Sequence, residues 1–251
     1  MTQTARETAF AALHIPGDPV VLFNIWDAGS AAAVGKAGAK ALATGSASVA
    51  GAQGFADGED VPLDLVFANL ERITHLTDLP VTLDFEGGYA VDADQVAANA
   101  QRARDAGAVG INFEDQVVGG EGLHPADMQG KRIQAIRQAT GDTFWINART
   151  DLFLKAAPDS HDRALLDEAL ERGRAYAGAG ASSLFLPGLA DPDLIRHACA
   201  HSPLPVNIMA MPTTPPRSDM AELGVARISH GPFPWRNAMK ALANAAKDAM
   251  S

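Results

Sequence analysis

Two acidic clusters follow short apolar runs in this sequence, and their spacing could place three carboxylates at one point. Asp84 and Glu86 close one run, and Glu114 closes the next. If the two runs are neighbouring parallel strands, the three side chains meet at the same edge of the sheet. Three carboxylates without a nearby histidine or cysteine favour magnesium (Mg²⁺) or manganese (Mn²⁺) over zinc. The alternative is that each is a helix cap or loop carboxylate, which accounts for one of them more easily than for all three.

A third polar cluster supplies the opposite charge. Arg149 ends another apolar run and stands two residues before Asp151. At the end of a strand, a guanidinium can bind a carboxylate or an enolate oxygen in the mouth that the acidic groups share. A structural ion pair between Arg149 and Asp151 is the other interpretation, and the spacing permits either.

The composition limits the classes of partner. The chain has 251 residues, of which 47% are hydrophobic and 6% aromatic, and its formal net charge is -10. Lysine and arginine are scattered, so nucleic acid and anionic membranes are poor partners. The single cysteine, Cys199, excludes a disulfide or metal-thiolate site within the chain. With no apolar signal core or membrane-spanning run, we expect a soluble cytoplasmic protein.

Apolar runs typical of strands alternate with helical patterns along the chain. The runs cover residues 20–25, 40–44, 80–85, 109–114, 143–148, 182–187, 205–209 and 225–229, with helical patterns such as 63–76, 92–106 and 235–249 between or after them. A glycine follows several helical patterns, as expected where a helix reverses into the next parallel strand, at Gly38, Gly107, Gly180 and Gly224. The pattern predicts an α/β fold, a (β/α)8 TIM barrel that forms a single domain over residues 1–251. The competing doubly wound sheet would need a glycine-rich turn after the first strand, which residues 24–30 do not provide.

In such a barrel the chemistry belongs to the loops that follow the strands, so the list of candidates is short. The candidates are Trp26, Asp27, Ser46, Ala47, Asp57, Asp84, Glu86, Glu114, Glu121, His124, Arg149, Asn207 and His230. Two long loops, after the second and fourth strands, could close over a ligand. His230 could line the mouth or be a core histidine, and Trp26 could wall the pocket or pack beneath the first loop.

Five of these segments resemble the isocitrate lyase and phosphoenolpyruvate mutase superfamily, and the resemblance covers almost the whole chain. They are NIWDAGS at 24–30, KALATGS at 40–46, LDFEGGY at 83–89, GINFEDQ at 110–116 and NARTD at 147–151. The resemblance implies a Mg²⁺-dependent enzyme that makes or breaks a bond next to an α-oxo acid through an enolate.

The same resemblance implies roles for individual residues. Asp84, Glu86 and Glu114 would hold the metal, partly through water. The backbone amides of Ser46 and Ala47 would cradle the carboxylate or enolate. Arg149 would neutralise that charge, and Asp57 would lie on a mobile gating loop. Further substrate contacts are expected from Trp26, Asp27, Asn207 and His230.

The loop after the fourth strand departs from the family pattern. Lyases of this superfamily carry a catalytic cysteine there, and Gly122 stands at that position within VGGEGLHP at 118–125. The lysine and asparagine that mutases use in this loop are also missing. Cys199 falls in a helical pattern and is expected to be a small buried side chain. His124, Glu121 or water therefore remain as proton donors.

Three functions are compatible with this set of residues. The first is a lyase or hydrolase that cleaves a C–C bond next to an oxo acid such as oxaloacetate without a thiol. The second is C–P chemistry on phosphonopyruvate, ranked lower because residues 53–59 contain no cation for a phosphorus group. The third is a catalytically silent protein that binds an oxo acid. A homo-oligomer, dimer or tetramer, is implied by the resemblance, but exchange of a C-terminal helix is doubtful because little sequence follows residue 249.

Overall fold

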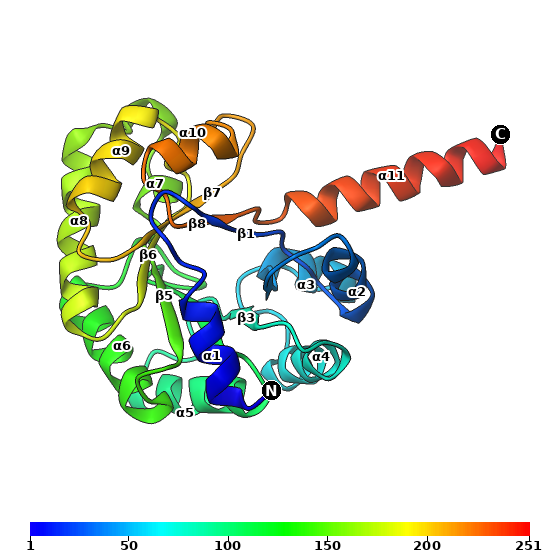
Figure 1. The fold of residues 1–251 in the computed structure, drawn as a ribbon, viewed down its shortest axis with the longest axis horizontal. Helices are drawn as coiled ribbons and strands as arrows, with labels where there is room; N and C mark the ends of the chain where they lie inside the picture. Colours follow the sequence, from blue (N-terminus) through cyan, green and yellow to red (C-terminus); the bar gives the residue numbers. More distant parts are fainter.

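The computed structural model describes residues 1–251 and contains eight parallel strands that curve into a barrel, with helices around it (Figure 1). The strands are β1 (Val20–Leu22), β2 (Leu42–Ala43), β3 (Val81–Asp84), β4 (Gly110–Glu114), β5 (Trp145–Arg149), β6 (Ser183–Leu186), β7 (Val206–Met209) and β8 (Arg227–Ser229). Their order in the sheet is β1-β8-β7-β6-β5-β4-β3-β2. A single parallel bridge, Ile25 to Thr44, closes the barrel between the ends of the β1 and β2 segments. The predicted TIM barrel is thus confirmed.

Most helices lie between successive strands and outside the barrel, whereas the first precedes β1 and the last follows β8. They are α1 (Gln3–Ala11), α2 (Ala28–Lys36), α3 (Ser46–Gln53), α4 (Leu63–Leu76), α5 (Ala93–Asp105), α6 (Ala126–Thr140), α7 (Leu152–Lys155), α8 (Arg163–Gly178), α9 (Pro192–His201), α10 (Arg217–Glu222) and α11 (Phe233–Met250), with a 3-10 turn η1 (Pro158–Ser160). The four glycines expected after helices have φ between 93° and 99°. This left-handed conformation is easily reached only by glycine, which explains why helices α2, α5, α8 and α10 stop where they do.

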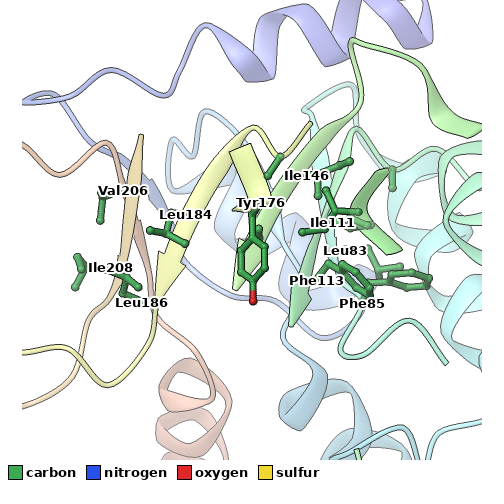
Figure 2. Close-up of a cluster of buried hydrophobic side chains, with 14 of the residues drawn as sticks. Leu83, Phe85, Ile111, Phe113, Ile146, Tyr176, Leu184, Leu186, Val206 and Ile208 are labelled. Atoms are coloured by element: carbon green, nitrogen blue, oxygen red, sulfur yellow. The ribbon is translucent and has the colours of Figure 1, made fainter. Parts of the chain in front are cut away.

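The main hydrophobic core lies between the outer surface of the barrel and the helices (Figure 2). Alternate strand residues point outward into it, among them Leu83, Ile111, Ile146 and Leu184, all almost fully buried. Tyr176 of α8 packs in the same cluster. Burial of these side chains stabilises the barrel and fixes which strand residues must face inward.

The opposite set of strand residues faces the barrel interior and is largely polar towards the carboxyl ends of the strands. Asn112, Asn147, Asn207 and Arg227 are all buried there. The amino-terminal end is instead closed by a small apolar cluster in which Phe10 of α1 packs against strand residues. One end of the barrel is therefore an apolar plug, and the other end is available for polar chemistry.

Helix α11 leaves the barrel and projects away from it (Figure 1). Only its first turn is attached: Trp235 packs so closely on α3 that a side chain added at Gly51 would lie 2.7 Å from its ring. Beyond that turn most residues are exposed, including Leu242 at 63%. None of the helices combines the length and apolar character needed to cross a membrane.

One segment differs from its predicted form. Within the long loop expected after the second strand, residues 46–53 form helix α3, with Gly45 as the N-cap and Gly54 in the left-handed conformation after its last turn. The helix is short and has few large apolar residues, so its periodicity is weak in the sequence. Its amino terminus points its free amides towards the carboxyl end of the barrel, where the candidate residues lie.

Candidate active site

A pocket of about 240 Å³ opens at the carboxyl ends of the strands. Its charged side chains are Asp57, Asp84, Arg149 and Arg236. The backbone of Ser46 and Ala47 at the start of α3 also lines it. This is the end of a TIM barrel at which active sites form, so we take this pocket as the candidate active site.

Asp84 is the acidic residue at the centre of the pocket, and both of its carboxylate oxygens are positioned. Oδ2 accepts a hydrogen bond of 2.9 Å from the backbone amide of Ser46, and Oδ1 lies 3.4 Å from Nδ2 of Asn112. The Asp84 amide donates to Thr44 Oγ1 at 2.9 Å. The neighbouring Ala47 amide donates to no protein oxygen, so it remains available to an anionic ligand.

A buried arginine lies beneath Asp84 and orients the amide that contacts it. Arg227 Nη2 and Asn147 Nδ2 each donate to Asn112 Oδ1 at 2.8 Å. These two bonds turn the NH₂ group of Asn112 towards Asp84. Burial lowers the pKa of Arg227 to about 9, although Asp84 opposes this shift. The guanidinium is therefore still charged at neutral pH and partly balances the acidic residues above it.

Arg149 forms ion pairs with two carboxylates. Its Nε and Nη2 bond to Asp151 at 2.5 and 2.8 Å, and its Nη1 lies 2.7 Å from Glu114 Oε2. Burial would lower the pKa of Arg149, but the carboxylates of Glu114 and Asp151 raise it. The structural ion pair with Asp151 is thus present. Because Nη1 and Nη2 each keep one further N–H, Arg149 can also donate to a ligand in the pocket.

Glu86 is turned away from the pocket towards the loop that carries Asp57. Its Oε2 accepts the backbone amides of Gly58 and Glu59 at 2.9 and 2.8 Å. Its Oε1 accepts the Tyr89 hydroxyl at 3.1 Å, while Glu59 Oε1 accepts the Tyr89 amide at 2.8 Å. We call this set, Gly58, Glu59, Glu86 and Tyr89, the loop clasp. Burial and the nearby Asp84 raise the pKa of Glu86 to about 7.

The loop clasp contains every non-glycine residue with a left-handed backbone. Glu59, Glu86 and Tyr89 have φ values of 62°, 52° and 57°. Such conformations persist where surrounding contacts determine them, and they gather at functional sites. The clasp holds Asp57 at the pocket, where burial and Asp84 raise the pKa of the Asp57 carboxyl. The expected gating loop is therefore fastened in place in this structure.

The three predicted metal ligands do not form a direct cage. No three His, Cys, Asp or Glu side chains stand close enough to surround a metal ion. Glu86 binds the loop amides and Glu114 pairs with Arg149, which leaves Asp84 alone facing the pocket. Burial raises the pKa of Glu114, and Arg149 lowers it. The carboxylates of Asp151, Asp84 and Glu86 raise the pKa of Glu114 further, because they lie close enough to repel its negative charge. An all-oxygen set with one open carboxylate and two behind it suits Mg²⁺, which usually keeps several waters.

Several predicted residues lie outside the pocket. Asp27 is the N-cap of α2 and is bonded to the Ser30 amide. The carbonyl of Trp26 accepts from Asn69, and its ring does not line the pocket. Asn207 is buried below the pocket and donates to Ser229. Three further candidates also lie outside the pocket. Glu121 is exposed, and His124 lines a separate cavity together with Arg132. His230 packs against Phe23 and lines a third cavity.

Other pocket residues had no role in the sequence analysis. Asn112 lies in one of the recognised motifs, and its inward position follows from strand alternation two residues before Glu114. Asn24 of the first motif donates to the Thr44 carbonyl and accepts the His230 amide. Arg236 has no such signal, because it lies in a helix whose first turn reaches the pocket only through tertiary packing.

The loop after β4 contains no thiol and places none near the pocket. Gly122 has φ of 73°, and a Cβ added there would have no neighbour within 4 Å. Cys199 belongs to α9, where it is half-buried beside Gly224. Burial raises the pKa of the Cys199 thiol to about 12.

We therefore expect thiol alkylation to leave the activity of the protein unchanged. With a pKa of about 12, Cys199 is almost wholly protonated at pH 8, and the thiol is a poor nucleophile. Treatment with iodoacetamide, followed by mass spectrometry and turnover assays, tests this. Cys199→Ser is the control. Loss of turnover on alkylation of a protein that remains folded would show that a thiol takes part.

These features define a (β/α)8-barrel protein with an acidic and cationic pocket at the carboxyl ends of its strands. The chain belongs to the phosphoenolpyruvate phosphomutase family, whose model matches residues 10–250. A crystal structure from Burkholderia cenocepacia, assigned provisionally as a phosphonomutase, is 50% identical, with a TM-score of 0.96 over 99% of this chain and all of that one. An uncharacterised Mycobacterium tuberculosis protein is 33% identical over 95% of this chain and 88% of its own length. The 2-methylisocitrate lyase of Escherichia coli is 29% identical over 82% of this chain and 71% of its own.

Proposed function

We propose that this protein is a Mg²⁺-dependent lyase or hydrolase that cleaves a C–C bond next to an α-oxo acid, with an oxaloacetate-like substrate and an enolate intermediate. The observation that supports this most is the joint presence of Asp84 and Arg149 in one small pocket at the start of α3. Its relatives are enzymes of one superfamily, named for C–C cleavage and for phosphomutase chemistry.

The proposed chemistry assigns a role to each part of the pocket. Asp84 would bind Mg²⁺ directly, and Glu86 and Glu114 would hold its water ligands. When bound, the ion would withdraw charge from the keto oxygen of the substrate. The Ala47 amide at the start of α3 and the free N–H groups of Arg149 would bind the substrate carboxylate and the charge that develops on the enolate. Asp57 would complete the wall of the pocket.

The proton that ends the reaction has fewer candidate donors than the sequence suggested. His124 and Glu121 lie outside the pocket, whereas Asp57 lines it. Burial and Asp84 raise the pKa of Asp57, which favours its protonated form. We therefore assign proton donation to Asp57 or to a water molecule that it binds.

Cleavage of a C–P bond is the second candidate function, and one observation favours it. The loop after β2 lacks a cation for a phosphorus group, but Arg236 brings one to the pocket from α11. An oxo acid binder without activity is the third candidate. The same assay separates the three.

Steady-state assays of the purified full chain test the proposed function. We expect oxaloacetate to be cleaved with Mg²⁺ or Mn²⁺, activity to vanish with EDTA, and activity to return when Mg²⁺ is restored. Phosphonopyruvate should be turned over more slowly. Preference for phosphonopyruvate would support C–P chemistry, and full activity in a metal-free preparation would contradict the metal assignment.

We also propose that the protein is a homo-oligomer in which α11 packs on a second copy. A groove of about 620 Å³ lies between β1 and α2, lined mainly by apolar residues such as Val21, Phe23 and Val34. It is larger than the charged pocket and shares no lining residue with it. Helix α11 projects away from the barrel (Figure 1), and beyond Trp235, which packs on Gly51 of its own chain, it carries an apolar stripe, Met239 and Leu242, at helical spacing.

The sequence analysis considered exchange of a C-terminal helix between subunits doubtful. The present proposal differs because α11 itself projects from the barrel and can pack on a second copy. Leu242→Asp places a charge on the exposed stripe and should shift the full chain towards monomer in light scattering after size exclusion. Lys247→Asp, on the same helix but outside the stripe, is the control. A wild-type chain that is monomeric at micromolar concentration would rule the oligomer out.

A further inference from the structure

Arg227 is a fully buried arginine that no carboxylate of the chain neutralises. It forms no ion pair. Its one hydrogen bond runs from Nη2 to Asn112 Oδ1, while Nε and Nη1 donate to no protein atom. Burial of an ion without a partner of opposite charge lowers the stability of a protein. Stability of the fold therefore gives no reason for a charged side chain at this position.

The guanidinium lies one layer below the floor of the candidate active site. Side chains two residues apart on a strand point to the same side of the sheet. Ser229 of β8 lines the pocket, so Arg227, two residues before it, faces the barrel interior beneath the pocket. From there Arg227 reaches across the barrel to Asn112, which lines the pocket from β4 on the opposite side. Its charge is thus fixed below the place that a ligand beside Asp84 would occupy.

The other neighbours of Arg227 do not balance this charge. Thr82, two residues before Asp84 on β3, and Asn207, the partner of Arg227 on β7, are buried and neutral. Below them, burial and the charge of Arg227 lower the pKa of His14 to about 3, so the His14 ring is neutral. Burial also lowers the pKa of Arg227, and Asp84 is the carboxylate that opposes this shift. The electrostatic influence of Arg227 is therefore directed mainly to the pocket.

A charge at this depth acts on a ligand without touching it. Buried charges interact through a lower effective dielectric constant than exposed ones, and salt screens them less. The charge of Arg227 attracts an anion in the pocket and repels Mg²⁺ in the same pocket. The hydrogen bond to Asn112 has a different effect, because its loss would disturb Asp84 and weaken the binding of both. The signs of the two changes therefore separate a role of the charge from a role of the hydrogen bond.

We propose that Arg227 is a specificity-determining residue whose buried charge favours anionic ligands in the pocket above it. This inference rests on the proposed function, because it takes an anionic oxo acid to bind beside Asp84. For a reaction that passes through an enolate, the same charge stabilises the negative oxygen as it develops. A neutral ligand of the same size gains nothing from Arg227.

Calorimetric titrations of the full chain with Mg²⁺ alone, and with the small dianion oxalate at saturating Mg²⁺, test the inference. Arg227→Met removes the charge, and Asn112 Oδ1 keeps its bond from Asn147. Oxalate should bind this variant roughly 10- to 100-fold more weakly than wild type, because one nearby unit charge is lost. Mg²⁺ alone should bind at least as tightly as it does to wild type. The metal-free variant should unfold in urea at no lower concentration than wild type, because a buried charge without a partner is gone.

Two further variants separate the charge from the hydrogen bond, and a third is the control. Arg227→Gln keeps a donor for Asn112 but no charge, so it should weaken oxalate binding as Arg227→Met does. Arg227→Lys keeps the charge and should bind oxalate within roughly threefold of wild type. Arg196→Met removes the same unit of net charge from an exposed position on α9 and should change neither affinity.

The possible results distinguish this inference from the proposed function. If wild type binds Mg²⁺ and oxalate, and Arg227→Gln binds oxalate like wild type, the charge has no role and the proposed function stands. The inference is also wrong if Arg227→Met weakens Mg²⁺ and oxalate alike, since Arg227 would then act by orienting Asn112. Early unfolding of both neutral variants would make Arg227 a structural residue. If wild type binds no oxalate with Mg²⁺, the proposed function fails and the inference fails with it.

Discussion

Replacing Asp84 with alanine is expected to remove Mg²⁺ binding and to lower kcat/KM by roughly 1000-fold, the upper range for loss of one preorganised charge-stabilising group. Asp84 is the only carboxylate of the predicted ligand set that opens to the pocket. Glu86 and Glu114 cannot replace it without giving up the loop amides or Arg149.

The fold should tolerate this change. Asp84→Ala loses the hydrogen bond from Ser46, but it also removes a negative charge that raises the pKa values of Asp57 and Glu86. Titration calorimetry with Mg²⁺, together with thermal unfolding, distinguishes loss of the site from loss of the fold. Glu121→Ala, an exposed carboxylate in the loop after β4, is the matched control. A folded Asp84→Ala protein with normal Mg²⁺ affinity would refute the metal assignment.

Replacing Arg149 with methionine should destabilise the protein by about 3–5 kcal/mol, because it leaves Glu114 and Asp151 buried without a partner. Both carboxylates are almost fully buried, and Arg149 is the guanidinium that reaches the two of them. Arg149→Lys should be milder in stability but should still lower kcat/KM by roughly 100-fold, since the planar fork is lost.

Urea unfolding of the two Arg149 variants beside wild type measures the effect on stability. Arg163→Met provides a control, because Arg163 and Asp167 form an exposed pair within α8 that contributes only about 0.3–0.5 kcal/mol. If Arg149→Met unfolds like wild type, the ion pairs are not needed for folding. In that case the role of Arg149 would be limited to binding the ligand.

The sequence predicts the barrel well because its signals are local. Strand positions follow from apolar runs between glycine-capped helices, and each of the eight observed strands falls within the expected run or extends it by one residue, as β5 does at Arg149. The inward position of Asp84 follows from alternation along β3. Helix α3 is less visible because its small residues give little periodicity.

The direction of individual site residues depends on contacts between segments that are far apart. Nothing near Glu86 in the sequence shows that it will bind the amides of Gly58 and Glu59, which lie 28 and 27 residues before it. The same holds for Arg236, which reaches the pocket because Trp235 packs on Gly51. The expected convergence of three carboxylates is therefore only partly present: Asp84 lines the pocket, whereas Glu86 and Glu114 are turned to other partners.

The loop clasp has a consequence for the thermodynamics of ligand binding. Its three left-handed residues cost on the order of 1–3 kcal/mol each. The hydrogen bonds that the backbone amides of Gly58 and Glu59 donate to the ionised form of Glu86 offset this cost by about 1.5–3 kcal/mol each and keep the loop closed. Because the loop is ordered during folding, a ligand that enters the closed pocket does not bear the entropy cost of ordering it. Small ligands can therefore bind with little loss of conformational entropy, while larger ones must first disrupt the clasp and will associate more slowly.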